Sequence, residues 1–323
     1  MKLENESKID FAVGGQAVIE GVMMRAPNHI TVAVRKESGA IKLKEEVYKS
    51  ICMRFKFLGT PFIRGVINLF EMMVVGMRML NFSANEMLEE EGDEDKEMTK
   101  KEKMIMGFSF AFSIVFALSL SLFLFKFLPL WITDYLSHQF AYIDQHYFIF
   151  NLIDGALKTT FFIAYIAILG LLPDLKRVFE YHGAEHKSIY TYENGLDLKV
   201  ENAKKQSRFH PRCGTSFILI VFLISILIYT VVPRQEEFLM NFLVRVMFLP
   251  VIAGISYEFL KWSAKKKDNI IMKALITPGL WFQRLTTREP DDSQLEVALK
   301  ALSKALELEN ESKKSLELQT QKA

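Results

Sequence analysis

The sequence predicts a mainly α-helical membrane protein with four transmembrane helices, an interfacial amphipathic helix, a small N-terminal β-hairpin region and cytoplasmic helices. Hydrophobic residues make up 50% of the 323 residues and gather in long blocks, although 24% of the residues are charged. A helix that crosses a hydrocarbon core about 30 Å thick needs roughly 20 apolar residues. Four blocks reach this length: residues 104–128, 148–172, 214–232 and 238–260.

The distribution of Lys and Arg predicts the orientation of these helices. The loop expected at residues 129–147 contains no Lys or Arg, whereas basic residues are frequent in residues 173–213 and on both outer flanks of the four blocks. Because cytoplasmic loops carry an excess of Lys and Arg, we expect both termini and residues 173–213 to lie in the cytoplasm. The net charge of +2, without a continuous basic patch, gives no indication of nucleic-acid binding.

Residues 1–54 are expected to form a β-rich cytoplasmic region. The segments 30–34 and 41–48 are rich in β-branched residues, and the turn signal at residues 37–39 lies between them. This pattern predicts a β-hairpin.

The run at residues 14–25 contains three glycines, which permit tight turns and close approach of the backbone. Its polar side chains are those of Gln16, Glu20 and Arg25. These side chains either line a site or pair with one another, and the sequence leaves both interpretations open.

Residues 55–85 are expected to form an amphipathic helix that lies along the cytoplasmic leaflet. Arg64, Glu71 and Arg78 recur at every seventh position and would lie near one helix face, which makes a spanning helix costly. This charged stripe either meets a site at the membrane surface or is a paired, partly solvated face. Residues 86–103 are nearly all charged and predict a flexible linker.

Residues 104–172 and 214–260 are expected to form two transmembrane hairpins. The first contains Asp154 and Lys158, four residues apart, and the second contains Arg245 at a similar depth. Charged side chains at such positions usually pair or extend to the interface, and a permeation path is the alternative interpretation.

The cytoplasmic loop at residues 173–213 is expected to contain a helix from Leu175 to Glu193. His182, Glu185 and His186 have the spacing i, i+3 and i+4, so they would project from one face of this helix. Two imidazoles and a carboxylate in this arrangement are typical of a metal site. The order H-x-x-E-H is the one used by the inverzincin metalloproteases.

A second group of candidate ligands, His210 and Cys213, lies at the same predicted membrane boundary. Imidazole and thiolate ligands favour a divalent transition metal, and we expect zinc. Four protein ligands would make a closed structural site, whereas an open position would permit catalysis with Glu185 as the base. The sequence leaves this choice open.

Glu258 lies near the predicted cytoplasmic end of the fourth block, in apolar surroundings. An unpaired ionised carboxylate is costly there, so we expect a cationic partner, either Lys261 or a metal ion. It is therefore a candidate supporting residue of the site.

Residues 261–323 are expected to form cytoplasmic helices. Pro278-Gly279 predicts a turn, and an apolar stripe that starts at Leu295 predicts a helix that packs on the cytoplasmic region. The polar tail from Glu307 is expected to be frayed.

Four runs of the chain closely resemble the YqhQ-like family of bacterial multi-pass membrane proteins. The resemblance covers about residues 14–305 and implies a location in the bacterial cytoplasmic (inner) membrane and a metal-dependent enzyme activity, without a substrate. At the matching positions it points to the His, Glu and Cys candidates above, with Gln16, Glu20 and Arg25 as their supporting residues. The runs are GGQAVIEGVMMR (14–25), EYHGAEHK (180–187), HPRCGTSF (210–217) and LTTREP (285–290).

Two functional hypotheses follow. The first is a membrane-embedded metal-dependent enzyme, hydrolytic in type, that acts at the cytoplasmic face on a membrane-protein, peptide or lipid-linked substrate. The second is a non-enzymatic membrane scaffold or assembly factor, in which the same residues form a structural metal site or a polar cluster. The lipid bilayer is the expected partner in both.

Overall fold

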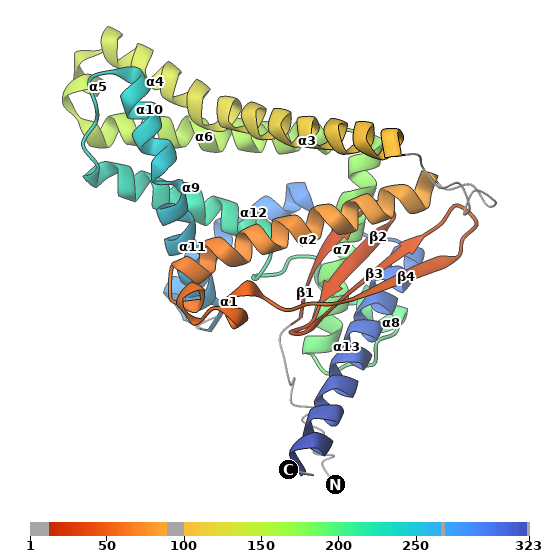
Figure 1. Ribbon diagram of the computed structural model, residues 1–323. Helices are drawn as coiled ribbons and strands as arrows, with labels where there is room; N and C mark the ends of the chain where they lie inside the picture. The colour runs from red at the N-terminus through yellow and green to blue at the C-terminus, as the bar shows by residue number, and fades with distance from the viewer. Residues whose placement is uncertain (1–12, 89–99, 266–268, 322–323) are drawn as a thin grey trace.

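The computed structural model describes residues 13–88, 100–265 and 269–321, and it shows a mainly helical chain with one β-sheet near the N-terminus (Figure 1). Long apolar helices lie on one side of the molecule, and the sheet with helices α7 (Pro173–Glu193) and α13 (Asp292–Gln321) lies on the other. The predicted linker at residues 86–103 falls mostly on residues 89–99, which lie outside the described residues.

The sheet is antiparallel, and its four strands follow one another in chain order. The predicted hairpin is confirmed, with Gly39 at its turn in a left-handed conformation (φ 87°). The sequence indicates only tight turns for residues 14–25, but these residues form a second hairpin because a two-residue connection, Ile19-Glu20, lets the flanking segments pair. The strands are β1 (Gly14–Val18), β2 (Gly21–Arg25), β3 (His29–Arg35) and β4 (Ile41–Val47).

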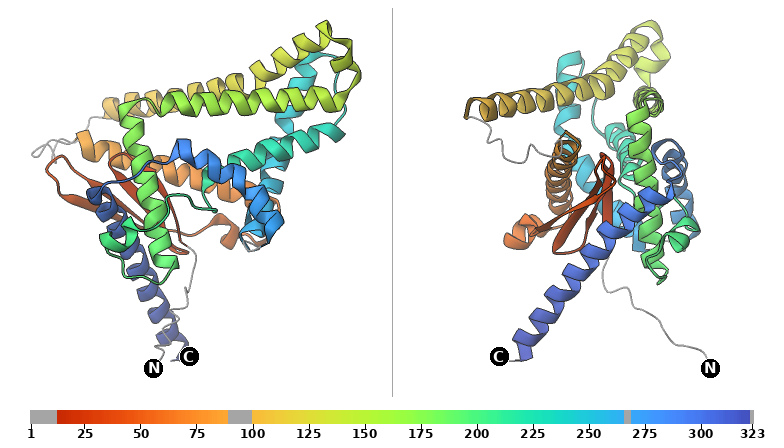
Figure 2. Two further views of the ribbon diagram at one scale, coloured as in Figure 1. Left: turned by 180° about the vertical axis from the view of Figure 1, so that it is seen from behind. Right: turned by 90° about the vertical axis from the view of Figure 1, so that its right-hand side faces the viewer.

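Helices cover both faces of this sheet (Figure 2). Helix α2 (Ile63–Leu88) packs on one face, while α7 (Pro173–Glu193) and α13 (Asp292–Gln321) pack on the other. The alternation of a β-strand sends Val32 and Val34 to the α2 side and Ala33 to the α7 side. The result is a three-layer domain with two small cores.

The amphipathic helix predicted at residues 55–85 is shorter at its start, since α1 (Ile51–Arg54) and a 3-10 turn (Lys56–Gly59) precede α2. The three charges of its stripe pair with residues outside the helix. Arg64 binds Glu258 of α11 (Leu249–Lys265), with 2.7 Å from Nε to Oε1, and Arg78 binds Glu46 of β4 at 2.9 Å. Glu71 accepts hydrogen bonds from Tyr48 and Ser50 at 2.8 Å each. The stripe thus fastens α2 to its neighbours.

Helix α7 confirms the prediction for the segment after the second block. It begins with Pro173 and ends at Glu193, and Gly195 follows with a φ of 65°, as a helix stop signal requires. The polar connector beyond it is partly helical, as α8 (Val200–Lys204).

Four helices within the described residues are long and apolar enough to cross a membrane, as the sequence predicts. The first is longer than expected. It covers Gly107–Gln139 and joins α3 (Lys100–Leu122) to α4 (Leu128–Gln139) through a π-helical turn (Phe123–Phe127).

The expectation of a loop at residues 129–147 was therefore wrong. Pro129 lies in the first turn of α4, where a missing N–H is tolerated, so it does not end the helical stretch. A further short helix, α5 (Ala141–Gln145), follows α4.

The other three apolar helices form a packed group. Helix α9 contacts α6, α11 and α12, and α11 also contacts α2 of the three-layer domain. The fourth apolar stretch is divided at Phe248 into two helices. The bounds are α6 (Tyr147–Leu169), α9 (Gly214–Val231), α10 (Phe238–Met247), α11 (Leu249–Lys265) and α12 (Ile270–Thr286).

The charged residues inside these helices pair with one another, as one interpretation of the sequence predicts. Arg245 donates to Asp154 at 2.7 Å and to Asn151 at 2.6 Å, and Lys158 donates to the same carboxylate. Tyr229 of α9 donates to the carbonyl oxygen of Arg245 at 2.7 Å. All of these side chains are buried, so the network joins α6, α9 and α10.

Two expectations for the C-terminal part were wrong. Pro278 and Gly279 lie inside α12 rather than in a turn, and α13 continues to Gln321 where fraying was expected from Glu307. Glu309 helps to explain the longer helix, because its carboxylate accepts hydrogen bonds from the backbone and side-chain N–H groups of Asn28 at 3.0 and 2.6 Å. The predicted apolar stripe is confirmed and packs against α7 and the sheet.

Candidate metal centre

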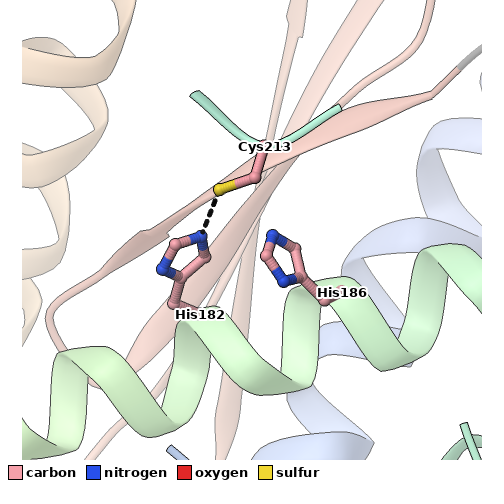
Figure 3. Close-up of side chains that lie close together, drawn as sticks. All are labelled: His182, His186 and Cys213. Atoms are coloured by element: carbon pink, nitrogen blue, oxygen red, sulfur yellow. Dashed lines mark hydrogen bonds between the residues drawn. The ribbon is translucent and has the colours of Figure 1, made fainter. Parts of the chain in front are cut away.

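Three candidate ligands from two parts of the chain meet beside the edge strand β1 (Figure 3). His182 and His186 project from consecutive turns of α7, as their spacing predicts. Cys213 is the N-cap residue of α9, and its thiol reaches over the two rings. One ligand atom from each of the three lies within 4.8 Å of the other two.

The two imidazoles are held in one orientation by backbone carbonyl oxygens. His182 Nδ1 donates to the carbonyl oxygen of Thr286 at 2.8 Å, and His186 Nδ1 donates to that of Arg208 at 2.5 Å. A carbonyl oxygen only accepts, so each Nδ1 carries the proton and each Nε2 is left for the cluster. Metal-binding histidines characteristically have this outer hydrogen bond.

The electrostatics of the cluster favour a thiolate at Cys213. The Sγ atom lies 3.2 Å from His182 Nε2. Burial alone raises the pKa of the Cys213 thiol, but the neighbouring His182 and His186 outweigh it and bring the pKa well below the ordinary value. Burial also lowers the pKa of His182, yet the charge and hydrogen bond of Cys213 raise it overall to about 9. A thiolate is the form of cysteine that binds metals.

Glu185, the candidate base, is buried on the same face of α7 as the two histidines. One of its oxygens lies 3.4 Å from His186 Nε2. Its side chain lies against Gly15 of β1, where a Cβ atom would be 2.6 Å from Glu185 Cγ. The absence of a side chain at Gly15 is what lets the carboxylate reach the cluster.

His210 lies beside this group of three rather than within it. Its ring is tilted by 39° relative to that of His186, with the centroids 5.7 Å apart. Its Nδ1 accepts from the backbone N–H of Arg212 at 3.3 Å, and its Nε2 lies 3.4 Å from Glu193. The structure thus places His210 next to the three clustered candidate ligands, and its predicted role as a fourth ligand stays a prediction.

The supporting candidates are separated by the fold. Gln16 lies against Gly76 of α2. Glu20 forms an ion pair with Arg177 and accepts from Tyr181 at 3.3 Å, so it ties the first hairpin to α7. Glu258 pairs with Arg64 instead of Lys261 or a metal ion. Of the four, only Arg25 lines the cavity at the cluster, which has a volume of about 360 Å³.

A family model described as "Protein of unknown function (DUF1385)" matches residues 60–308. The chain belongs to this family. It is also 36% identical over 312 residues to "Uncharacterized protein YqhQ" of Bacillus subtilis, a match that covers 94% of this chain and 95% of that protein. This confirms the resemblance noted in the sequence, and no solved structure matches the chain. The DUF1385 match includes all three clustered candidate ligands and Glu185, while Gly15 and Arg25 precede it.

Several positioning residues of this DUF1385 protein were not predicted. Gln283 of α12 is buried and forms two hydrogen bonds with the backbone of His210. Its Oε1 accepts from the N–H of His210 and its Nε2 donates to the carbonyl oxygen of His210, each at 2.7 Å. Thr286 and Arg208 bind the two histidines only through their backbone carbonyl oxygens, so their residue types in the sequence did not indicate this role. The runs 210–217 and 285–290, which resemble the family, meet at His182, because Cys213 of the first and the carbonyl oxygen of Thr286 of the second both contact its ring.

Replacing Gly15 with alanine is expected to displace Glu185 and lower the free energy of unfolding by about 1–3 kcal/mol, the usual cost of overpacking. The matched control is Gly14→Ala, because a Cβ at Gly14 would have no heavy atom within 4 Å. Its effect is expected to stay within about 0.5 kcal/mol. Thermal unfolding of both variants in the same detergent compares them, and equal losses would contradict the close packing of Glu185 on β1.

Proposed function

We propose that the four apolar helices span the bacterial cytoplasmic membrane, with both termini and the three-layer domain in the cytoplasm. The exposed large apolar side chains of these helices support insertion, since they would otherwise face water. The excess of Lys and Arg on the segment that contains α7 and α8 supports the orientation. In this arrangement the His–Cys cluster lies at the inner membrane surface, at the start of α9.

We further propose that the protein is a metal-dependent enzyme of hydrolytic type, with zinc bound by His182, His186 and Cys213. The observation that carries this proposal is the pair of Nδ1 bonds to carbonyl oxygens, which leaves both Nε2 atoms beside the Cys213 sulfur. Three protein ligands at a cavity of about 360 Å³ leave room for a water molecule and a substrate, as in catalytic zinc sites.

The surrounding residues suit hydrolysis at this position. Bound zinc supplies Lewis acidity and makes water a better nucleophile near neutral pH. Glu185 lies next to His186 and would accept the proton from the attacking water, then return it to the leaving group. The position at the membrane surface favours a membrane-protein, peptide or lipid-linked substrate.

A non-enzymatic scaffold or assembly factor is the second candidate. It is favoured by the fact that the residues of the cluster and their hydrogen-bond partners come from three parts of the fold. These are α7, the segment before α9 and the end of α12. A metal ion bound there would fasten these three elements together, as structural zinc sites do.

Metal analysis of the purified protein, with Glu185→Gln beside it, tests both candidates. An enzyme predicts about one zinc per chain in both proteins and loss of cellular function only in the Glu185→Gln variant. A structural site predicts that the Glu185→Gln variant keeps both zinc and function, and that a chelator unfolds the protein. Absence of zinc from the wild-type protein would rule out the metal site.

The membrane orientation predicts which introduced cysteines react with a membrane-impermeant maleimide in intact cells. In a background without the two native cysteines, Tyr142→Cys is expected to react, because α5 lies in the predicted outer connection. Lys199→Cys, in the connector before α8, is expected to react only after the cells are permeabilised. The reverse labelling pattern would contradict the orientation.

A further inference from the structure

The cavity at the candidate metal centre extends to both sides of the edge strand β1. On the α7 side it is lined by the His–Cys cluster and Glu185, and on the α2 side by Met23, Arg25 and Met72. The strand residues between the two sides are Gly14 and Gly15. Because they have no side chains, the two walls share one continuous space.

Arg25 brings a positive charge into this space. It is the last residue of β2 and pairs with Gly14 of β1. A Cβ atom added to Gly14 would have no heavy atom within 4 Å. Its guanidinium donates from Nη1 to the Met72 sulfur at 3.0 Å and lies 4.3 Å from the centre of the Tyr48 ring. A thioether is a weak acceptor and a ring carries no net charge, so neither partner neutralises Arg25.

Glu185 lines the α7 side of the cavity, next to His186, and the other two nearby carboxylates have partners of their own. Glu71 lies beyond the Tyr48 ring, and it accepts from Tyr48, Ser50 and the backbone N–H of Ile51. Glu193 pairs with Arg212. Within residues 13–88, 100–265 and 269–321, no carboxylate forms an ion pair with Arg25.

We propose that Arg25 is a substrate-binding residue that holds a phosphate group opposite the metal ligands. This inference rests on the proposed metal-dependent activity and names the substrate class for the same cavity. A guanidinium presents paired N–H donors that match the oxygens of a phosphate, and an uncompensated cation in a half-buried position favours an anionic ligand. The phosphate belongs either to a lipid headgroup at the membrane surface or to a small soluble phosphate ester.

The test measures binding of radiolabelled inorganic phosphate to the full-length protein in an uncharged detergent, by equilibrium dialysis, with the zinc content determined for each sample. Arg25→Gln is expected to weaken binding by at least about tenfold, because it removes a charge-assisted bidentate contact. Arg25→Lys keeps the charge without the paired geometry and should lie in between. Arg78→Gln is the matched control, since Arg78 is exposed on α2 and pairs with Glu46.

Mixed micelles then identify the source of the phosphate. Competition by phosphatidylglycerol, and none by diacylglycerol, would support a lipid headgroup. Binding of inorganic phosphate that phosphatidylglycerol does not displace would support a soluble ester.

Equal phosphate affinities of the wild type and Arg25→Gln, with zinc retained in both, would overturn this inference and leave the metal site standing. Failure of inorganic phosphate and phosphatidylglycerol to bind the wild type would overturn it as well. Absence of zinc together with phosphate binding that depends on Arg25 would instead refute the proposed metal centre alone.

Discussion

Replacing Cys213 with serine is expected to weaken zinc binding on the order of 100-fold or more. The hydroxyl of serine is not a thiolate, so the variant loses one of three clustered ligands, and even outer-shell partners of metal ligands contribute about 10–100-fold. His182→Ala is expected to have an effect of the same order, since its Nε2 lies 3.2 Å from the Cys213 sulfur and belongs to the same cluster. Competition with a chelating zinc indicator measures the affinity of each variant.

His210→Gln is the matched control for these ligand variants. Its ring is next to that of His186, but its two nitrogens engage the Arg212 backbone and Glu193. We therefore expect its zinc affinity to fall far less than that of Cys213→Ser. An equal loss in both variants would show that His210 is a fourth ligand, and unchanged affinity in Cys213→Ser would contradict the three-ligand centre.

Replacing Asp154 with asparagine is expected to lower the free energy of unfolding by roughly 3–5 kcal/mol, the cost of breaking a buried ion pair. Asp154 is the shared carboxylate of Arg245 and Lys158, and all three side chains are buried among α6, α9 and α10. Its removal leaves two buried cations without an anion. Thermal unfolding in detergent or lipid nanodiscs measures the loss.

The control for this prediction is Asp144→Asn, the same substitution at an exposed ion pair with Arg234. Arg234 keeps its bond to Asp134 at 2.9 Å, and exposed pairs contribute about 0–1 kcal/mol. If Asp154→Asn proved as mild as this control, the buried network would not be what joins the three helices.

Much of the architecture was predictable because it depends on local patterns. Runs of about 20 apolar residues identify the long helices, and a proline start with a glycine stop defines α7. The first long helix shows the limit of such reasoning. A proline usually ends a helix, but Pro129 lies in the first turn of α4, directly after a π-helical turn, and the helical stretch continues.

The candidate site was predicted in part. The spacing of His182 and His186 places both on one face of α7, and this local geometry holds in the structure. The surroundings of His210 and Glu258 depend on partners in other elements, Glu193 of α7 for His210 and Arg64 of α2 for Glu258. Residue type alone does not reveal such partners, because a histidine or glutamate is equally suited to a ligand and to an ion pair.

By itself, the sequence determined the apolar helices, one β-hairpin, helix α7 and the shared face of its two histidines, since each follows from contacts within a few residues. Only the tertiary structure decided that Cys213 completes the cluster, that Thr286 and Arg208 orient the imidazoles, and that Arg25 shares the cavity. These features arise where strand β1, α7, α9 and α12 meet. Backbone carbonyl oxygens and the glycines of β1 shape that meeting point. The sequence shows the glycines, but it does not show that Glu185 packs against Gly15 or which carbonyl oxygens bind the two imidazoles.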